Sequence, residues 1–424
     1  MRSDNRGDEN VVIPYEPMTS NSPGAAAHDA PARVSLLPVF LIVLVDVFGM
    51  TLVLPLLAIY AESFHATPLE ATLLVSVFAA CQLVSAPLIG HWSDRIGRKP
   101  MLVLSQIGTF IGFVMLAEAH ALWMIYLSRV IDGATAGNLS LVQAYIADNT
   151  APEDRAKSLA LIGIAFGLGF FVGPSLTGYL SAKYTLATPI WVAAGMSAGS
   201  ILCTLTLLTG GHAGAPVAER RAMLNWRTYA VYFARPGLRA RLLQFFFYIL
   251  SFSTFMSGFA LFAERRYTWQ GHPFGPREIG FVLGYVGLLG IILQGGLIGR
   301  LVKRYGEAAL VAAGFLSLIV GYAWLGVSYS VASLLGVATI FSFGIGIVRP
   351  TLSSLITQYA ARHEQGIVAG LTSSLNSMGN ILAPVLAGLF IEHHRLVAWA
   401  WVAGAMAIVG AVLTSRSPEP AQVV

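Results

Sequence analysis

Uncharged apolar runs of about twenty residues, separated by short polar loops, recur along the chain and limit its fold more than any other feature. Hydrophobic residues make up 56% of the chain and charged residues only 11%, whereas soluble domains carry about 25% charged residues. The mean hydropathy is +0.69. A soluble fold has too little interior for this much apolar surface, but a bilayer accepts it. We therefore predict an all-α integral membrane protein.

Twelve transmembrane helices are predicted when the apolar runs are read with a window of about 19 residues. The first six are expected near residues 36–60, 70–90, 100–118, 121–147, 156–181 and 188–210. The second six are expected near residues 242–263, 278–299, 308–327, 331–358, 366–391 and 396–415. These sets define an N-terminal bundle at 36–210 and a C-terminal bundle at 242–415, joined by a basic cytoplasmic linker at 211–241. Residues 1–35 and 416–424 are predicted to be tails, the first disordered and without the apolar core of a signal peptide.

Positive charge is distributed unevenly over the loops between the predicted spans. Segments on the side of the N-terminus hold 19 of the 26 Lys and Arg residues, segments on the other side hold 5, and Arg129 and Arg349 lie inside spans. Cytoplasmic loops of membrane proteins are enriched in Lys and Arg. Both termini are therefore predicted to be cytoplasmic, in a multi-pass protein of the inner cell membrane. The same distribution accounts for the net charge of +5 without a nucleic-acid partner.

The two predicted halves share motifs at a nearly constant spacing. At an offset of 209 residues, "GHWSDRIGRK" at 90–99 aligns with "GRLVKRYGEA" at 299–308 and shares two glycines and one arginine with it. At an offset of 210 residues, "VGPSLTG" at 172–178 aligns with "LAPVLAG" at 382–388. Two motifs at almost one offset indicate duplication of a six-helix unit, which is typical of secondary transporters. We therefore expect two pseudo-symmetric six-helix bundles.

Three ionisable residues fall deep within the predicted spans of the first half. Asp46 lies ten residues into span 1, at a depth of about 15 Å. Arg129 and Asp132 lie one turn apart in span 4 and share a helix face. A charge at this depth is costly unless it is paired, hydrated or protonated, so both acids are candidate proton carriers, and Arg129 is a candidate partner. The alternatives are a structural role for Asp46 and a permanent Arg129–Asp132 pair.

Other polar and aromatic residues in the spans are candidates for a substrate cavity. Together with Asp46 and Arg129, the candidates are Asn138, Tyr248, Phe252, Phe255, Gln294, Arg349 and Asn376. The aromatic stripe of span 7 fits a bulky apolar ligand, and Arg349 in span 10 fits an anionic group or an acid. The alternatives are lipid contact for the aromatic rings, interhelical hydrogen bonds for the amides and snorkelling of Arg349 toward the inner surface.

Span 5 is rich in glycine, whereas motifs for nucleotides, metals and catalysis are missing from the sequence. Gly169, Gly173, Pro174 and Gly178 are spaced for close helix packing and for a hinge. The chain has no Walker-type loop, no zinc-ligand spacing and no nucleophile elbow. We expect no enzyme activity, cofactor or metal site, and a monomer whose energy source is a proton gradient.

These motifs resemble those of the major facilitator superfamily. "GHWSDRIGRK" matches the signature GxxxDRxGRR/K between spans 2 and 3 through Gly90, Asp94, Arg95, Gly97, Arg98 and Lys99. "RVIDG" resembles the span 4 signature, and "VDVFGMTLVLPLLA" is similar to the span 1 acid motif of drug exporters. "GLGFFVGPSLTG" resembles the span 5 antiporter signature, with Ala160 where a leading glycine is usual. Over residues 36–415, the chain is most similar to the twelve-helix drug:proton antiporters, and among them to the tetracycline-exporter-like group.

The resemblance implies two six-helix bundles around a cavity lined by spans 1, 4, 7 and 10, which works by alternating access. It implies an antiporter that exports drugs or other small amphipathic compounds in exchange for protons carried by Asp46, alone or with Asp132. It also implies a cytoplasmic latch between the halves, formed by Asp94 and Arg98. The acids that tetracycline exporters carry in spans 3 and 9 are missing here, so the resemblance leaves open whether tetracycline itself is transported.

Other functions on the same fold stay open at this point. The chain would equally suit export of an endogenous siderophore, sugar or lipid. Import by proton symport is disfavoured by the span 5 motif. A non-transporting sensor would need a binding module, and the two tails contain none that we recognise.

Overall fold

A computed structural model describes residues 37–150, 155–208, 226–360 and 364–415. The predicted tails and most of the predicted linker lie outside these residues. The helices of the first half are α1 (Leu37–Glu62), α2 (Pro68–Ile96), α3 (Arg98–Ala117), α4 (Leu122–Thr135), α5 (Asn138–Asn149), α6 (Arg155–Lys183) and α7 (Thr188–Leu207). The second half contains α8 (Trp226–Ala234), α9 (Pro236–Arg266), α10 (Pro276–Ile292), the π-helical turn η2 (Leu293–Leu297), α11 (Ile298–Tyr305), α12 (Glu307–Val327), α13 (Val331–Gln358), α14 (Gln365–Glu392) and α15 (Leu396–Ser415). A short antiparallel hairpin, β1 (Thr268–Trp269) with β2 (His272–Pro273), follows α9.

Eleven helical segments of the described residues are long and apolar enough to cross a membrane, with α10, η2 and α11 together forming one of them. The remaining span consists of α4 and α5, which are each too short to cross alone. The fold class predicted from the apolar runs is therefore confirmed. Several helices extend beyond the predicted spans, and α9 begins at Pro236, inside the segment predicted as linker, whereas α7 ends at Leu207, three residues before its predicted end.

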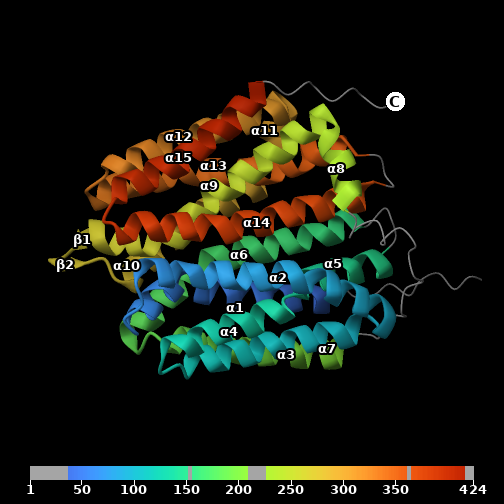
Figure 1. The fold of residues 1–424 in the computed structure, drawn as a ribbon, viewed down its shortest axis with the longest axis horizontal. Coiled ribbons are helices and arrows are strands. Elements are labelled where there is room, and N and C mark those ends of the chain that lie inside the picture. Colours follow the sequence, from blue (N-terminus) through green and yellow to red (C-terminus); the bar gives the residue numbers. More distant parts are fainter. Residues whose placement is uncertain (1–36, 151–154, 209–225, 361–363, 416–424) are drawn as a thin grey trace, which may run out of the picture. The chain divides into compact units, whose positions relative to one another are not determined.

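The helices form two bundles. In the first, α1 packs against α6 and α7, and α3 packs against α4 and α7. In the second, α12 packs against α13 and α15, and α9 packs against α14 and α15. Figure 1 shows the blue-to-green helices α1–α7 gathered on one side and the yellow-to-red helices α9–α15 on the other. Two strips join the bundles, one where α6 lies on α10 and one where α2 lies on α14.

The bundles meet closely at the end where α1 and α9 terminate, here called the Glu62 end. A Cβ atom on Gly178 of α6 would lie 2.8 Å from the carbonyl oxygen of Pro276, so only glycine permits this approach. On the other strip, Ser76 of α2 donates a hydrogen bond to the carbonyl of Ile381 at 2.7 Å. Small residues let helix backbones approach in this way inside a membrane.

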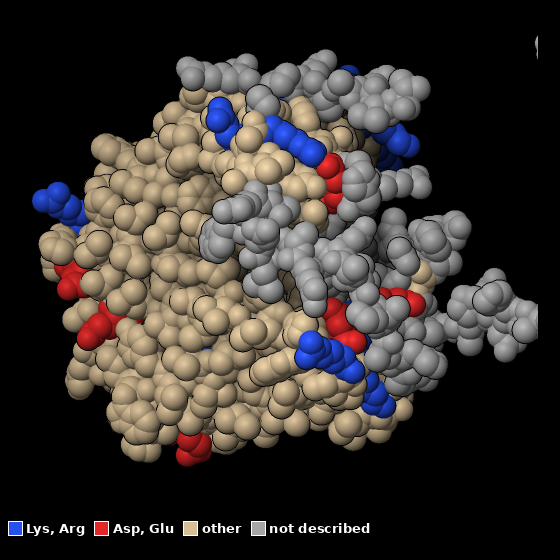
Figure 2. Space-filling model, turned by 45° about the vertical axis from the view of Figure 1, so that its right-hand side comes forward, with Lys and Arg blue, Asp and Glu red and all other residues tan. Residues whose placement is uncertain are grey.

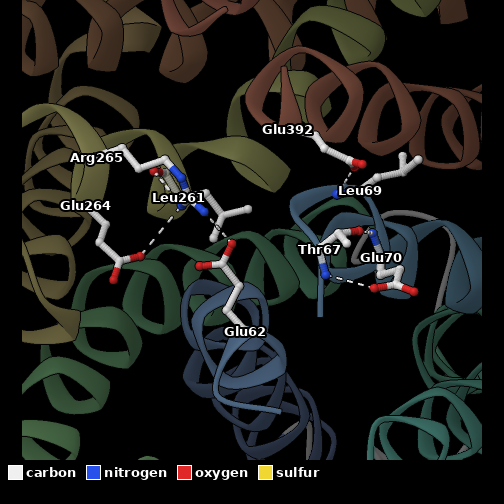
Figure 3. A network of polar contacts seen from close by, with 8 residues as sticks. All are labelled: Glu62, Thr67, Leu69, Glu70, Leu261, Glu264, Arg265 and Glu392. Carbon is white, nitrogen blue, oxygen red and sulfur yellow. Dashed lines mark hydrogen bonds and ion pairs between the residues drawn. The ribbon is translucent and has the colours of Figure 1, made fainter. Parts of the chain in front are cut away.

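Polar contacts close the same end (Figure 3). Arg265 of α9 donates to Glu62 of α1 at 2.6 Å. Glu392, at the end of α14, accepts a hydrogen bond from the backbone N–H of Leu69 at 3.2 Å. Both contacts join one bundle to the other across the Glu62 end.

The bundles separate toward the opposite end, here called the Asp94 end. The face of α2 that holds Ser76 against α14 continues through residues one turn apart, and on it Val84 is 68% exposed. On the second strip, a Cβ atom on Gly167 would still touch Ile291 at 3.3 Å, but one on Gly163 would meet nothing within 4 Å. The gap between the bundles therefore opens at the Asp94 end.

Charged side chains avoid the broad middle of the surface. Figure 2 shows Lys, Arg, Asp and Glu at the margins of the face, with a wide area of uncharged residues between them. An uncharged belt of this kind suits the hydrocarbon of a bilayer.

Span 4 is broken, although the sequence predicted one continuous helix over 121–147. The chain leaves helical geometry at Ala136 and Gly137, between α4 and α5. Ser105 of α3 satisfies the freed backbone, because its hydroxyl donates to the carbonyl of Thr135 and accepts from the N–H of Gly137 at 3.0 Å. Irregular backbone at membrane depth is tolerated where protein groups satisfy it in this way.

The signature turn between spans 2 and 3 is confined to one residue of the motif. Residues 90–96 are still helical and belong to α2, so Gly90 does not form the turn. The chain reverses at Gly97 alone, with φ of 106°, and its counterpart Gly306 has φ of 78°. These angles lie in the left-handed region that favours glycine. The two halves therefore repeat the turn as well as the sequence.

Candidate functional site

The carboxylate of Asp46 lies inside the N-terminal bundle, where α1 faces α7. Ser200 of α7 donates a hydrogen bond to Asp46 Oδ1 at 3.1 Å. Gln106 of α3 in turn donates from Nε2 to the Ser200 hydroxyl at 2.8 Å. Asn138, the first residue of α5, lies beside the same carboxylate. Residues of α5 and α7 therefore contact this acid of α1, and α3 reaches it through Ser200.

Arg129 and Asp132 form a buried ion pair within α4. Arg129 Nη1 lies 3.1 Å from Asp132 Oδ2, and both side chains are almost fully buried. The guanidinium also stands over the ring of Phe113 of α3, 5.9 Å from its centroid. Asp132 interacts electrostatically with Asp46. The structure thus brings the three predicted coupling residues into one cluster.

Several polar atoms of this cluster have no hydrogen-bond partner among the described residues. They are Asp46 Oδ2, Gln106 Oε1, Arg129 Nη2 and Asn138 Oδ1. Buried polar atoms are normally satisfied, and clusters of exceptions call for a functional explanation. A charge state that changes during a working cycle would leave such atoms without fixed partners. Among the described residues, no group of His, Cys, Asp and Glu side chains could hold a metal ion.

The candidates of the second bundle lie apart from this cluster. Tyr248 of α9 is fully buried and stacks on Phe252 with 6.0 Å between centroids. Phe255 lies in the aromatic core of its bundle, 4.4 Å from the ring of Phe341. There it lines a narrow apolar cavity between α9, α10, α12 and α13, with room for little more than a water molecule.

Arg349 of α13 is exposed, and within the described residues no hydrogen bond or ion pair to it is recorded. It lies close enough to the buried Tyr248 hydroxyl to interact with it electrostatically. Gln294 is exposed in the turn η2, and Asn376 is half-buried in α14. No contact recorded in the described residues joins these side chains to Asp46.

The signature motif binds elements of the N-terminal bundle. Arg98 pairs with Asp94 at 2.6 Å and with Asp148 of α5 at 2.8 Å. Its Nη1 also donates to Ser93 Oγ at 2.5 Å. Both ion pairs of Arg98 therefore stay within one bundle, in a structure whose bundles are apart at this end.

The two remaining cations of the motif behave differently from Arg98. Lys99 donates to the carbonyl oxygens of Leu205 and Leu208 at 2.9 and 2.7 Å, and so holds the end of α7. Arg95 is exposed on the last turn of α2. Lys99 therefore has a packing role besides its charge.

The span 5 motif packs on both neighbours of α6. Cβ atoms on Gly169 and Gly173 would collide with Val47 and Thr51 of α1. Gly178 approaches the start of α10, and the carbonyl of Pro174 faces Gly280. The motif therefore joins the helix that carries Asp46 to the other bundle.

Comparison with known proteins identifies the family. The sequence profile described as Major Facilitator Superfamily matches residues 39–384 and, overlapping them, 298–423. The chain belongs to the major facilitator superfamily. It is a transporter of this superfamily and not an enzyme.

Relatives of this major facilitator chain include proteins named for drug resistance. It is 28% identical over 374 residues to the tetracycline resistance protein, class B, of Escherichia coli, covering 86% of this chain and 90% of that protein. It is 26% identical over 394 residues to multidrug resistance protein 2 of Bacillus subtilis, covering 89% and 94%. Among solved structures, the human organic anion transporter MFSD10 (TETRAN) is 25% identical with a TM-score of 0.68, covering 90% and 99%. The similarity to the tetracycline-exporter-like group is therefore confirmed.

Gln106 and Ser200 escaped the sequence analysis. A signal was nevertheless present, since Ser197, Ser200 and Thr204 recur at helical spacing on one face of an otherwise apolar span. All three are buried. A polar stripe on such a helix predicts contact with another polar group inside the bundle.

Proposed function

We propose that this major facilitator chain is a proton-coupled exporter of small amphipathic compounds. The observation that carries the proposal is the buried cluster of Asp46, Asp132 and Arg129, in which Asp46 Oδ2 and Arg129 Nη2 have no hydrogen-bond partner among the described residues. Two acids and one cation in a low-dielectric site hold a net charge that is costly until a proton neutralises it. The names of the drug-exporting relatives support the same direction of transport.

The proposed orientation places both termini and the Asp94 end in the cytoplasm of the inner membrane. It rests on the bias of Lys and Arg toward the loops on that side. The structure then corresponds to an inward-open state, because its bundles are joined at the Glu62 end. Substrate enters from the cytoplasm or the inner leaflet while a proton leaves the acid cluster. The loaded protein turns outward, releases the substrate and is protonated again.

Transport in proteoliposomes tests the coupling. The wild-type chain, Asp46→Asn and Asp132→Asn are compared with and without an imposed proton gradient. We expect at least one of the two variants to lose uptake driven by the gradient, while Glu118→Gln, which changes an exposed acid at the end of α3, retains it. Proton coupling that survives in both aspartate variants would disprove the proposal.

A second candidate, export of organic anions, is favoured by Arg349. This exposed cation in α13 has no recorded counter-charge in the described residues, and one relative is named as an organic anion transporter. Arg349→Gln should reduce transport of a carboxylate compound by about tenfold, the value of a charge-assisted hydrogen bond. The corresponding methyl ester should be transported as before. Arg395→Gln, an exposed cation at the Glu62 end, is the control.

Endogenous metabolites stay within the proposal. The cluster and the cavity residues do not separate a drug from a siderophore, sugar or lipid. Growth of an efflux-deficient host on a panel of toxic compounds, with and without a protonophore, separates them.

A further inference from the structure

We infer that Gln106 and Ser200 are positioning residues, which fix the proton of Asp46 to one oxygen and keep this exchange inside the N-terminal bundle. The inference rests on the proposed proton coupling and deepens it. It assigns roles to two residues that no motif of the superfamily signature contains.

The hydrogen-bond chain has a fixed direction. The amide Nε2 of Gln106 can only donate, and it lies 2.8 Å from the Ser200 hydroxyl. Because that hydroxyl then serves as acceptor, its own proton points to Asp46 Oδ1 at 3.1 Å. Turning the amide round would make Ser200 donate to Gln106 and leave the carboxylate without this donor. The direction found is therefore the one that satisfies an ionised Asp46.

The two oxygens of Asp46 consequently differ. Oδ1 accepts from Ser200 whether the carboxyl group is ionised or protonated. Oδ2 is buried and has no partner in the described residues. A proton arriving from the medium forms its O–H bond at Oδ2, and the Ser200 bond at Oδ1 is retained. Loss of that proton restores the ionised carboxylate, whose bond to Ser200 becomes charge-assisted and stronger.

The hydrogen bonds that link Gln106, Ser200 and Asp46 cross the N-terminal bundle away from the second half of the molecule. They run from α3 through α7 to α1, and both Gln106 and Ser200 are 0% exposed. The helix α1 also contacts α9 and α10 of the other bundle. A change in the strength of the Asp46–Ser200 bond therefore alters how α1 packs on α7, and α1 carries the change to the bundle interface. The substrate need not touch the proton site.

Few other charged groups face this site. Asp132 of α4 acts on Asp46 electrostatically and is itself paired with Arg129. The helix α7 contains no charged residue, and α2, α5, α6, α9 and α10 carry theirs within two turns of their ends. The pH response at Asp46 is therefore governed by Asp132 with its partner Arg129, by Asn138, and by the hydrogen bonds that run from Gln106 through Ser200.

A neighbouring serine provides a matched control. Ser197 lies one turn before Ser200 on the same buried face, and its hydroxyl donates to the backbone carbonyl of Gln106 at 3.4 Å. Ser197→Ala removes a hydroxyl between the same two helices without breaking the chain to Asp46. It tests whether loss of any buried hydroxyl is sufficient to shift the pH profile of transport.

The experiment measures gradient-driven transport against pH in proteoliposomes for Ser200→Ala, Gln106→Leu and Ser197→Ala, with Ser200→Thr as the conservative variant. Without the chain, the ionised carboxylate loses its strongest donor. Half-maximal activity should therefore move to higher pH by about one unit in Ser200→Ala and Gln106→Leu. Ser197→Ala and Ser200→Thr should keep the wild-type profile. Infrared titration of the carboxyl band, assigned with Asp46→Asn, gives the same readout without transport and applies to variants that bind but do not transport.

The outcomes separate the inference from the proposed function. Wild-type profiles in Ser200→Ala and Gln106→Leu, with coupling lost in Asp46→Asn, would overturn the inference and leave proton coupling standing. Coupling retained in Asp46→Asn and in Asp132→Asn would overturn the proposed function itself. Equal shifts in Ser197→Ala and Ser200→Ala would reduce Ser200 to a packing residue.

Discussion

Arg98 and Glu307 occupy equivalent positions 209 residues apart and make the same kind of connection with opposite charge. Arg98, at the start of α3, binds Asp148 near the end of α5. Glu307, at the start of α12, accepts hydrogen bonds from Ser354 and Gln358 near the end of α13, both at 2.7 Å. Each half thus ties its third span to the end of its fourth. The acid at Asp94, by contrast, has Lys303 as its counterpart.

This asymmetry predicts unequal effects of neutralising the two turns. Asp94→Asn removes an ion pair of 2.6 Å to the buried Arg98, whereas Lys303 is exposed. Arg98 keeps its ion pair with Asp148 but loses one of its two carboxylate partners, and removing a partner from a buried cation is destabilising. Asp94→Asn should therefore lower the transport rate by about tenfold or more, and Lys303→Asn by less than about twofold. Initial rates at matched expression measure both, and equal rates would mean that the motif only sets topology.

The contact between Glu62 and Arg265 predicts how the Glu62 end opens. Both side chains are partly exposed, so the pair contributes only about 0.2–1 kcal/mol. Arg265→Ala should raise the population open at this end by about two- to fivefold. Spin labels near the ends of α1 and α9 report the distance distribution. Exchanging the charges, with Glu62→Arg and Arg265→Glu together, should restore the wild-type distribution. An unchanged distance distribution in Arg265→Ala would show that the pair does not control opening of the Glu62 end.

The glycines between α6 and α10 predict a steric effect on the equilibrium between the closed and the open Glu62 end. A Cβ atom on Gly280 would collide with the carbonyl of Pro174, whereas one on Gly290 would meet nothing within 4 Å. Gly280→Val should lower transport by about tenfold or more because overpacking here displaces a backbone. Gly290→Val should retain activity within about twofold. Similar losses in both variants would point to helix propensity instead of contact.

The linker helix α8 supplies a prediction about pH. Arg235 forms two hydrogen bonds with Glu364, at 2.9 and 2.8 Å, and these raise the pKa of Arg235. Burial, followed by the nearby carboxylate, raises the pKa of Tyr232 above its ordinary value of 10.0. A group whose pKa is higher in the folded state than in the unfolded state stabilises the fold when the pH is below its unfolded-state pKa. This stability is lost only as the pH rises through its folded-state pKa.

Their contribution should therefore be constant between about pH 6 and 9 and disappear only above about pH 10. Glu364→Gln should lower the melting temperature in detergent by about 1–3 °C at every pH in that range. Tyr232→Phe, which keeps the ring stacked under Arg235 at 4.6 Å, is the control for packing. A penalty that varied between pH 6 and 9 would assign the titration to another group.

The apolar runs were enough to predict the fold, because each bilayer-spanning helix must carry its own stretch of apolar residues. The acids and Arg129 could be found for the same reason, since a charge in such a stretch is conspicuous. The break at Ala136 and Gly137 could not be found, because α3 supplies the compensating hydroxyl of Ser105 from a distant part of the chain. Phe255 illustrates the same limit: its spacing fits a cavity wall as well as the aromatic core in which it lies.

The hydrogen bonds that link Gln106, Ser200 and Asp46 could not be predicted from the sequence either. The three residues are separated by up to 154 positions, and hydroxyls and amides in membrane helices usually serve packing. Only the arrangement of α1, α3 and α7 distinguishes a donor aimed at an acid from one aimed at a backbone carbonyl.

The strip between α6 and α10 has a mechanical consequence. Cβ atoms on Gly178, Gly280 and Gly287 would meet backbone atoms of the facing helix, so backbone lies against backbone at these three positions. Rolling one helix over the other changes few rotamers and displaces few interlocked groups, unlike motion across an interdigitated interface. The strip therefore holds the two bundles together, and it is also the line about which they can rotate at the lowest free-energy cost.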